Sequence, residues 1–320
     1  MPTKEELKEL QSRTLEQKIM LTQTRIIEWY EHWKGQVYVS FSGGKDSTVL
    51  LHIARQLYPD IEAVFVDTGL EYPEIREFVK TFGNVTKLKP KLRFDEVIKV
   101  YGWNFPSKDV ANAVWYARRG SNWAVNVFKG LNYDGTASGF KERYIKWAYL
   151  LDAPFIISNQ CCIVMKEEPL RRFEKEQKKH PIMATMAEES QRREDAWKKT
   201  GCNAFEGKLK SSKPISFWTE QDVLSYLKIN NLDYCSVYGD IVVKGQIEGQ
   251  TTFDNIIPGE LITTGEDRTG CMFCPVGCHL DNPNKYQRMK ITHPKQYDYC
   301  MREENGLGLA KVLDFIGVKY

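Results

Sequence analysis

The sequence predicts an α/β fold, in which a parallel twisted sheet carries helices on both faces, with a small cysteine-bearing region toward the C-terminal end. Three observations predict it. Short runs of β-branched and aromatic residues alternate with segments of helical periodicity over the first ninety residues. A glycine pair directly follows the first of these predicted strands. Most of the eight cysteines gather in two distant segments.

The first ninety residues provide the parallel part of the sheet. Apolar residues recur at helical spacing over 4–33, which predicts one or two amphipathic helices that lead into the main fold. A strand, a helix and a second strand then follow one another, and this succession is typical of a βαβ unit with parallel strands. The predicted strands cover 37–41, 61–66 and 85–88, and the predicted helices between them cover 48–58 and 73–82.

The remaining segments extend the pattern less regularly. Residues 90–150 hold many aromatic residues among basic ones; we expect them to be mostly helical and either to pack a core or to stack nucleobases. Beyond them we expect helices over 167–179, 190–199 and 219–230, a strand over 181–186, a basic linker over 208–213 and a hairpin over 237–253. The expected domains are an N-terminal helical segment (1–34), a nucleotide-binding α/β domain (35–235) and a C-terminal cysteine-bearing region that binds a metal cluster (236–320).

Composition narrows the class of protein. Hydrophobic residues make up 42% and charged residues 27%, an ordinary globular composition, and no run approaches the roughly 18 apolar residues that span a bilayer. The charged N-terminal segment has no apolar signal core. We therefore expect a cytoplasmic protein without a membrane partner, whose cysteines are free thiols, metal ligands or catalytic groups. The net charge of +3 neither requires nor excludes a nucleic-acid partner.

The loop over 42–47 has the properties of an anion-binding turn. It lies between a predicted strand and a predicted helix, so backbone N–H groups and a helix N-terminus face its centre. The two glycines permit a tight turn and a close approach of phosphate oxygens, the lysine adds a cation, and the aspartate can hold a magnesium ion. An ordinary glycine-rich turn is the alternative. The predicted nucleotide-binding residues are Ser42, Gly43, Gly44, Lys45, Asp46 and Ser47, and of these Lys45 and Asp46 are also predicted to be catalytic.

Two separated cysteine groups have the spacing of a metal site. Cys161 and Cys162 are adjacent, and a Cys-x-x-Cys pair, Cys271 and Cys274, follows roughly a hundred residues later. Four thiolates from two distant segments fit a tetrahedral zinc ion and an iron–sulfur cube equally well on spacing alone. Cys278 is a fifth cysteine in this region. It can replace Cys161 as a ligand, act as a redox or sulfur-carrying thiol, or be a buried hydrophobe.

The loop and its neighbouring segments resemble a known family. Residues 42–47 match the SGGxDS loop of the PP-loop adenine-nucleotide hydrolases, and segments 39–58 and 64–71 resemble the branch that contains sulfonucleotide reductases and ATP sulfurylase small subunits. The resemblance touches most of 36–280 and implies a PP-loop fold of the Rossmann type. In that branch the end of the second strand lies near the nucleotide. The residues at that position here, which the resemblance implies as nucleotide-binding, are Asp67, Thr68 and Gly69.

The cysteine groups resemble those of assimilatory adenylyl-sulfate reductases, in which a tandem Cys-Cys and a later Cys-x-x-Cys bind a four-iron, four-sulfur cluster. The resemblance therefore implies a [4Fe-4S] cluster in this chain. Its ligands would be Cys161, Cys162, Cys271 and Cys274, and Lys166 stands where the family has a lysine near the cluster. A structural zinc site is the alternative for the whole group.

A further segment of resemblance follows the fourth predicted strand. Glu189, Ser190 and Arg193 match the family's Glu-Ser-x-x-Arg, in which the polar groups face the nucleotide or its leaving group. The resemblance implies that Glu189 and Arg193 are catalytic and that Ser190 binds the nucleotide. The family more often has Gly and Arg upstream, where this chain has Ala184 and Met186. A helix N-terminus with an i,i+4 ion pair is the alternative interpretation.

One motif of the sulfonucleotide reductases is missing from these 320 residues. Those enzymes attack sulfate sulfur with a cysteine in a C-terminal Glu-Cys-Gly motif, and residues 306–320 contain no cysteine. Reduction needs a thiolate at the sulfur atom, so we do not expect reductase chemistry by the usual route. The complete Ser-Gly-Gly-Lys-Asp-Ser loop is instead typical of members that cleave ATP between its α and β phosphates.

The loop and the cysteines together favour an ATP-using enzyme of the phosphoadenosine phosphosulfate reductase family that resembles its DNA-phosphorothioation branch. It would adenylate a substrate oxygen, release pyrophosphate and support sulfur transfer, with magnesium at the phosphates and a [4Fe-4S] cluster. The expected partners are an adenine nucleotide, a nucleic-acid substrate and a sulfur-donor protein such as a cysteine desulfurase; the acceptor is open among DNA, transfer RNA and a small molecule. The alternatives are a sulfonucleotide reductase that releases sulfite and a non-catalytic nucleotide-sensing module.

Overall fold

The chain forms two compact units, each described by itself below. The computed structural model describes residues 2–139, 141–207, 209–245 and 259–320. The first unit consists of Met1–Asp67, Glu71–Leu88 and Leu170–Thr269, and the second consists of Thr68–Leu70, Lys89–Pro169 and Gly270–Tyr320. Compact units need not coincide with functional domains, so the domain ranges 1–34, 35–235 and 236–320 stay a prediction.

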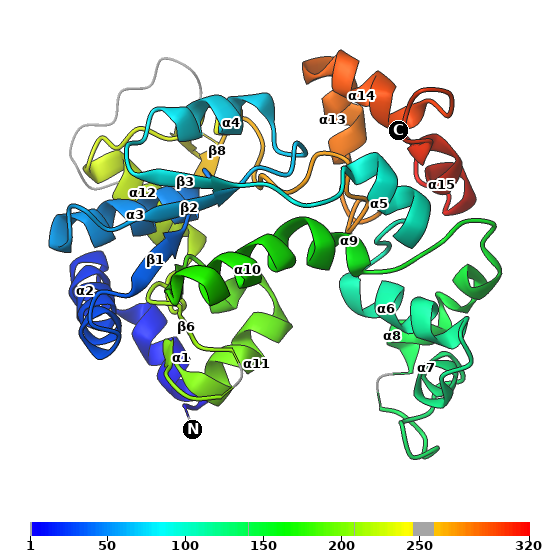
Figure 1. Ribbon diagram of the computed structural model, residues 1–320, viewed down its shortest axis with the longest axis horizontal. Coiled ribbons are helices and arrows are strands. Elements are labelled where there is room, and N and C mark those ends of the chain that lie inside the picture. The colour runs from blue at the N-terminus through cyan, green and yellow to red at the C-terminus, as the bar shows by residue number, and fades with distance from the viewer. Residues whose placement is uncertain (1, 140, 208, 246–258) are drawn as a thin grey trace. The chain divides into compact units, whose positions relative to one another are not determined.

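A six-stranded sheet forms the centre of the first unit (Figure 1). Its strands are β1 Val37–Ser40, β2 Ala63–Val66, β3 Val85–Leu88, β4 His180–Met183, β5 Asn203–Ala204 and β6 Ser211–Ser212. They lie in the order β3-β2-β1-β4-β6-β5, and every neighbouring pair is parallel except β5 with β6. The α/β class with a parallel sheet is thereby confirmed.

Helices cover both faces of this sheet (Figure 1). They are α1 Lys4–Ser12, α2 Leu15–His32, α3 Lys45–Leu57, α4 Pro73–Lys80, α10 Glu168–Gln177, α11 Gln191–Thr200 and α12 Glu220–Ile229. On one face, Phe173 of α10 packs in a buried cluster with Tyr38 of β1 and Val64 of β2. Side chains alternate along a strand, so Val39 faces the opposite way from Tyr38. On this opposite face α3 contacts β1, and α2 and α12 pack against α3.

The N-terminal helices are joined to α12 by a buried ion pair. Lys18 Nζ of α2 lies 2.7 Å from Asp222 Oδ2, and the two side chains are only 3% and 13% exposed. The two N-terminal helices, α1 and α2, begin with capping boxes, in which Thr3 and Thr14 accept hydrogen bonds from the first turn. The segment 4–33, expected to form one or two helices, thus forms α1 and α2.

Replacing Lys18 with methionine is expected to lower the free energy of unfolding by about 3 kcal/mol. The buried Asp222 carboxylate would lose its cation and keep only the hydrogen bonds from Thr219 N and Oγ1. Urea denaturation followed by tryptophan fluorescence measures the change, with the exposed Lys8→Met as the control. A loss below about 1 kcal/mol would show that the pair behaves like a surface ion pair instead.

The second unit is mainly helical. Its helices are α5 Phe94–Tyr101, α6 Lys108–Ala117, α7 Asn122–Phe128, α8 Glu142–Ile145, α9 Gln160–Cys162, α13 Lys285–Thr292, α14 Pro294–Met301 and α15 Leu309–Phe315, with a 3₁₀ turn η1 Ala148–Asp152 and a π-helical turn η2 Ile163–Glu167. The helical expectation for 90–150 agrees with α5–α8. Several aromatic rings of this stretch contact one another, such as Phe105 with Trp147 and Tyr101 with Trp115, which favours the core-packing interpretation.

Two expectations need correction or completion. The basic linker expected over 208–213 contains β6, in which Ser212 pairs with β4 and both residues pair with β5. A two-residue strand shows no period, and its place is fixed by its neighbours' hydrogen bonds. The hairpin expected over 237–253 begins with a 3₁₀ turn, η4 Ser236–Tyr238, and pairs β7 Ile241–Val243 with β8 Leu261–Thr263. Residues 246–253 of that prediction lie outside the described residues.

No helix in the described ranges is both long enough and apolar enough to cross a membrane.

Candidate functional sites

The loop over 42–47 lies between β1 and α3 in the first unit. Successive strands run from β1 outward through β2 to β3, whereas β4 lies on the other side of β1, so the strand order reverses at β1. Ligands of open α/β sheets bind outside the carboxyl ends of the strands at such a switch point. The segment with Glu189 and Arg193 follows β4, the adjacent strand. The topology therefore brings the two predicted motifs to the same edge of the sheet.

Glycine is required at the second loop position. Gly43 has φ +73°, a conformation that other residues rarely adopt, and a Cβ there would lie 2.7 Å from Val79 Cγ2. Serine hydroxyls close the loop: Ser42 N donates to Ser47 Oγ at 3.2 Å, and Gly44 N donates to Ser42 Oγ at 3.3 Å. The loop is thus preorganised, because its turn is held by its own hydroxyl groups.

The lysine of the loop is buried against residues from the end of the unit. Lys45 Nζ lies 2.9 Å from Glu220 Oε1 and donates to the backbone oxygen of Asp267 at 2.5 Å. Its backbone N–H donates to Tyr238 Oη at 3.2 Å, and the hydroxyls of Tyr238 and Thr269 are 2.7 Å apart. The ammonium group therefore has partners without any ligand, and one of them is a carboxylate.

The half-buried Asp46 has one carboxyl oxygen, Oδ1, that is enclosed in the protein. Its Oδ1 has no hydrogen-bond partner among the described residues. Burial raises its pKa, Lys45 opposes this rise, the nearby Glu220 adds to it, and Arg193 and Arg268 oppose it further. A buried carboxylate oxygen costs free energy unless something binds it. Its position at the predicted phosphate site fits a magnesium ion, which prefers oxygen ligands.

Two arginines, Arg193 and Arg268, lie near this carboxyl group, and Lys213 lies near Arg193. Burial lowers the pKa of Arg193, and the proximity of Arg268 lowers it further. Burial also lowers the pKa of Lys213, and the positive charge of Arg193 lowers it further. Cations that depress one another's pKa in a partly buried cluster gain from a bound anion. Arg193 also forms an ion pair with Glu189, the helix-end pairing given as the alternative for that segment.

The remaining predicted nucleotide-binding residues divide between the two units. Ser190 caps α11 and accepts from Arg193 N at 3.4 Å. Asp67 follows β2 in the first unit and pairs with Arg76 at 3.3 Å. Thr68 and Gly69 belong to the second unit, where Thr68 Oγ1 accepts from Leu70 N at 3.2 Å. The use of all four predicted residues as nucleotide ligands stays a prediction.

Sequence reasoning missed several residues at the loop. Lys213 falls in the expected linker, and Arg268 stands three positions before the first cysteine of Cys-x-x-Cys. Glu220 and Tyr238 lie in or near segments that resemble the family, but no pattern linked them to the loop. A basic residue three positions before a metal-site motif was the signal that could have found Arg268. The missed residues are Glu220, Tyr238 and Arg268 at the loop, together with Lys213 near Arg193.

The four predicted cluster ligands line one cavity in the second unit. They are Cys161, Cys162, Cys271 and Cys274, and the cavity is completed mostly by apolar side chains together with Asn104 and Lys166. The tandem cysteines stand on α9, where the helix widens into the π-helical turn η2, a feature frequent at functional sites. The Cys-x-x-Cys segment is attached through Met272 N, which donates to Leu70 O at 2.8 Å.

The chemistry of this cavity fits a thiolate-bound metal group, although its size is small. The free volume is about 20 Å³, room for about one water molecule. A cluster would therefore require the cysteine side chains to turn outward. Within the described ranges, no group of three or more His, Cys, Asp and Glu side chains is arranged to hold a metal ion. Asn104 is 1% exposed and its Oδ1 finds no hydrogen-bond partner in the described part of the chain.

The tandem cysteines share a proton unequally. A hydrogen bond from Cys161 lowers the pKa of Cys162 to about 6 against the effect of burial, with help from Lys108, Lys166 and the amide of Asn104. Asn104 Nδ2 lies 3.5 Å from Cys162 Sγ. The pKa of Cys161 is raised, because its S–H is held by Cys162 and the group is buried. One thiolate is therefore available for a metal at neutral pH.

Cys162 of the metal-free protein is expected to react with iodoacetamide faster at pH 7 than Cys278. A lowered pKa means that the thiolate of Cys162 is present at pH 7 and is lost as the pH falls through about 6. Burial raises the pKa of Cys278 to about 12, so its thiol stays protonated throughout. Peptide mass spectrometry between pH 5 and 8 gives both rate profiles. A profile for Cys162 centred near 8.5, the ordinary thiol value, would contradict the expectation.

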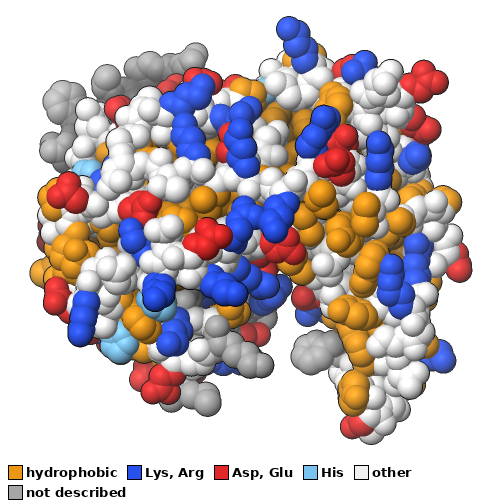
Figure 2. All heavy atoms as spheres, in the orientation of Figure 1, with side chains coloured by type: hydrophobic (Ala, Val, Ile, Leu, Met, Phe, Trp, Pro, Cys, Tyr) orange, Lys and Arg blue, Asp and Glu red, His pale blue; other side chains and the backbone are white. Residues whose placement is uncertain are grey.

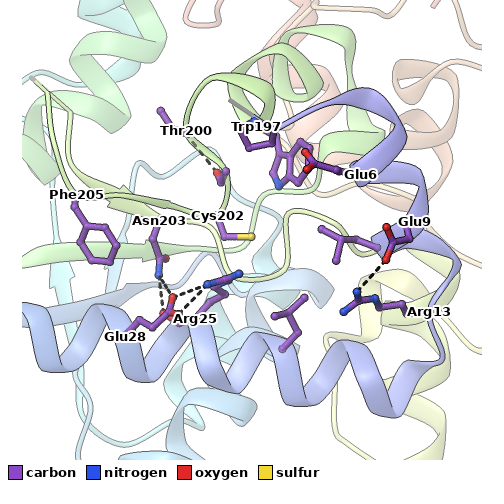
Figure 3. A pocket seen from close by; sticks show the side chains of 14 residues that line it. Glu6, Glu9, Arg13, Arg25, Glu28, Trp197, Thr200, Cys202, Asn203 and Phe205 are labelled. Carbon is purple, nitrogen blue, oxygen red and sulfur yellow. Dashed lines mark hydrogen bonds and ion pairs between the residues drawn. The ribbon is translucent and has the colours of Figure 1, made fainter.

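A larger cavity in the first unit, of about 440 Å³, contains none of the predicted site residues (Figure 3). It lies between the N-terminal helices and the segment that follows α11. Four of its charged side chains form ion pairs, Arg13 with Glu9 and Arg25 with Glu28, and Glu6 accepts a hydrogen bond from Thr3 N. Burial raises the pKa of Cys202, so this thiol is not activated. We assign no chemistry to this cavity.

One family model and several curated proteins match this chain. The family model described as phosphoadenosine phosphosulfate reductase domain matches residues 36–121 and 129–279, which include every predicted site residue. An uncharacterized protein of Methanocaldococcus jannaschii is 25% identical over 85% of this chain and 49% of its own length. The chain thus spans about half the length of the first curated relatives that it matches. The phosphoadenosine 5'-phosphosulfate reductase of Xylella fastidiosa is 24% identical over 73% of this chain and 80% of its own.

Among solved structures, the U34-tRNA thiolase NcsA of Methanococcus maripaludis, with its [4Fe-4S] cluster, is 15% identical. The match covers 95% of this chain and 82% of the thiolase, with a TM-score of 0.36. A structural likeness at this level says nothing about the chemistry of the present chain.

Proposed function

Because the chain belongs to the phosphoadenosine phosphosulfate reductase family, we propose that it is a PP-loop enzyme that uses ATP and magnesium to adenylate a substrate oxygen in support of sulfur transfer. The observation that carries the proposal is the buried, unpartnered Oδ1 of Asp46 beside the loop lysine and two arginines, within the described residues. A metal–polyphosphate complex satisfies both the carboxylate and the cations, whereas a simple anion satisfies only the cations.

The proposed reaction assigns a task to each charged group at the loop. An acceptor oxygen attacks the α-phosphorus of ATP, the bond to the oxygen that bridges to the β-phosphate breaks, and pyrophosphate leaves with the electron pair. Lys45, Arg193 and Arg268 would neutralise the charge that develops on the leaving group. Asp46 would hold the magnesium ion, which shields the phosphates when bound. The amides at the N-terminus of α3 would orient the phosphates.

The cysteine cavity is proposed to hold a [4Fe-4S] cluster. Four thiol groups, with no histidine or carboxylate side chain among the described lining residues, make a donor set that suits iron–sulfur clusters. When bound, the cluster would supply an iron atom at which sulfur can be accepted or positioned. Asn104 and Lys166 would then lie beside the sulfur ligands. Structural zinc is the competing assignment, and metal analysis separates the two.

The partners of the proposed reaction follow from its balance. Adenylation activates an oxygen for displacement, so a sulfur nucleophile must replace AMP, and a persulfide-bearing donor protein such as a cysteine desulfurase would supply it. A second thiol would then cleave the S–S bond between acceptor and donor, leaving one sulfur on the acceptor and a disulfide on the thiols. We propose a nucleic acid as the acceptor, with DNA and transfer RNA as the candidates; a small molecule is the alternative acceptor.

A second candidate function is sulfonucleotide reduction. It is favoured by the family model and by the similarity to the Xylella fastidiosa enzyme over 73% of this chain. In that reaction a thiolate attacks the sulfur of adenylyl sulfate, AMP leaves, and a dithiol then reduces the thiosulfonate and releases sulfite. Cys278 or a partner protein would have to supply the attacking thiolate.

One experiment separates these functions. The protein is purified without oxygen, and its iron, sulfide and zinc are measured. It is then incubated with ATP and magnesium, with and without transfer RNA or plasmid DNA, and separately with adenylyl sulfate and a dithiol. AMP and pyrophosphate together with about four irons per chain support the adenylating enzyme. Sulfite release supports the reductase. ATP binding without either product indicates a nucleotide-sensing module, and zinc without turnover excludes both enzymes.

A further inference from the structure

The ammonium group of Lys45 is paired with a carboxylate of the protein itself. Its Nζ lies 2.9 Å from Glu220 Oε1, and the side chains of the two residues are 5% and 46% exposed. The lysine is thus fixed inside the protein, while the glutamate reaches it from the solvent side. A phosphate that is to bind Lys45 must compete with this carboxylate.

We propose that Glu220 is a positioning residue for nucleotide selection: it holds Lys45 in the free protein and is displaced when a polyphosphate binds. The inference rests on the proposed function, because it takes the loop over 42–47 as the phosphate site. Binding is then an exchange of one anion for another. Ligands without a phosphate for Lys45 cannot drive the exchange, so Glu220 lowers the affinity of polyphosphates and leaves that of adenosine unchanged.

The backbone of Glu220 is anchored independently of its side chain. Thr219 caps α12 in a reciprocal capping box with Asp222, and Glu220 N donates to Glu188 Oε2 at 2.8 Å. The helix end therefore stays in place when the side chain of Glu220 turns away. The vacated position lies at a helix N-terminus, where the N–H groups favour an incoming anion.

The charge around Glu220 also favours its release once a nucleotide arrives. Its carboxylate raises the pKa of Asp46, which shows that the two negative groups are close enough to repel each other. A bound phosphate adds further negative charge at this place. Lys45 keeps a second protein partner, the backbone oxygen of Asp267 at 2.5 Å, so it does not lose its position when Glu220 departs.

The opposite role for Glu220 would change ATP affinity in the opposite direction. If Glu220 instead orients Lys45 toward the phosphates, its removal weakens nucleotide binding. The two roles therefore differ in the sign of one measurable quantity, the change in ATP affinity on Glu220→Gln, a substitution that keeps the size and one acceptor oxygen but removes the charge.

The test is isothermal titration calorimetry of the full chain with ATP–magnesium and with adenosine. For Glu220→Gln the dissociation constant of ATP is expected to fall about three- to tenfold, while that of adenosine stays unchanged. Glu188→Gln removes a carboxylate at the same helix end without touching Lys45, and is expected to change ATP affinity less than twofold, roughly the size of a distant charge effect. In a Lys45→Met background, Glu220→Gln is expected to have no effect on ATP binding.

An unchanged or weaker ATP affinity in Glu220→Gln overturns the inference, as does an equal gain in the Lys45→Met background. If ATP binding is detectable only after the substitution, the inference is supported; if neither protein binds ATP, it is overturned. Turnover is measured separately, so tight ATP binding without AMP formation would sink the proposed function and leave the role of Glu220 standing. Thermal melting of each variant confirms that it is folded.

Discussion

Replacing Asp46 with asparagine is expected to lower the rate of AMP formation from ATP by about 10²- to 10³-fold. The amide keeps the size of the carboxylate but loses the charge that attracts magnesium. Chromatographic measurement of AMP over a series of magnesium concentrations gives the loss. Asp195→Asn makes the same chemical change on α11, where the carboxylate is half-exposed and pairs with Lys198, and should keep the wild-type rate. A loss of less than threefold in Asp46→Asn would remove Asp46 from the proposed reaction.

The same substitution is expected to stabilise the ligand-free protein at neutral pH. Burial raises the pKa of Asp46, so the folded protein holds this proton more tightly than the unfolded chain does. The stability linked to the proton is complete below the ordinary aspartate pKa and is lost as the pH rises through the raised value. The gain in melting temperature of Asp46→Asn over wild type should therefore be larger at pH 7 than at pH 4. Calorimetry at both pH values, without magnesium, tests this; a gain that does not grow with pH would contradict it.

The loop itself could be predicted because its shape depends on residues adjacent in sequence. The strand before it is a short β-rich run, the helix after it has apolar periodicity, and Gly43 takes the positive φ that a tight turn requires. The parallel sheet follows for the same reason, since a βαβ unit is a local succession of elements. These features carry their signal within a few neighbouring residues.

The surroundings of the loop could not be predicted in this way. Glu220, Tyr238 and Arg268 come from segments far along the chain, and their arrival depends on how α12 and the β7–β8 hairpin fold back. Each is one charged or aromatic residue among many, and no spacing distinguishes it. A two-residue strand such as β6 is missed for a similar reason, because its pairing comes from β4 and β5 and not from its own two serines.

The cysteine site was partly predictable. The spacing of the two groups indicated a metal site and left zinc and iron open, and only the resemblance to a family implied a cluster. The structure brings the four cysteines to one cavity. It adds Asn104 and Lys108, whose contributions to the pKa of Cys162 come from a helix and a loop with no cysteine motif. The positions of Asn104 and Lys108 beside Cys162 depend on tertiary packing, which local sequence patterns do not encode.

Replacing Cys162 with alanine is expected to reduce the iron content of the anaerobically purified protein from about four atoms per chain to nearly none. Cys162 lines the cavity and carries the lowered pKa that makes a thiolate available to a metal. Losing one of four ligands opens the cluster to solvent and oxygen. Iron and sulfide analysis, together with the visible absorption of the cluster, measures the loss.

Cys278→Ala is the matched control for this prediction, since Cys278 is a neighbouring buried cysteine that is not among the described residues lining the cavity. It should keep its iron. If Cys278→Ala loses the iron while Cys161→Ala retains it, Cys278 replaces Cys161 in the ligand set. One zinc atom and no iron in the wild type would contradict the cluster altogether. Because a metal that binds only the folded state stabilises it, thermal melting should fall in parallel with iron content, and only in the variants that lose a ligand.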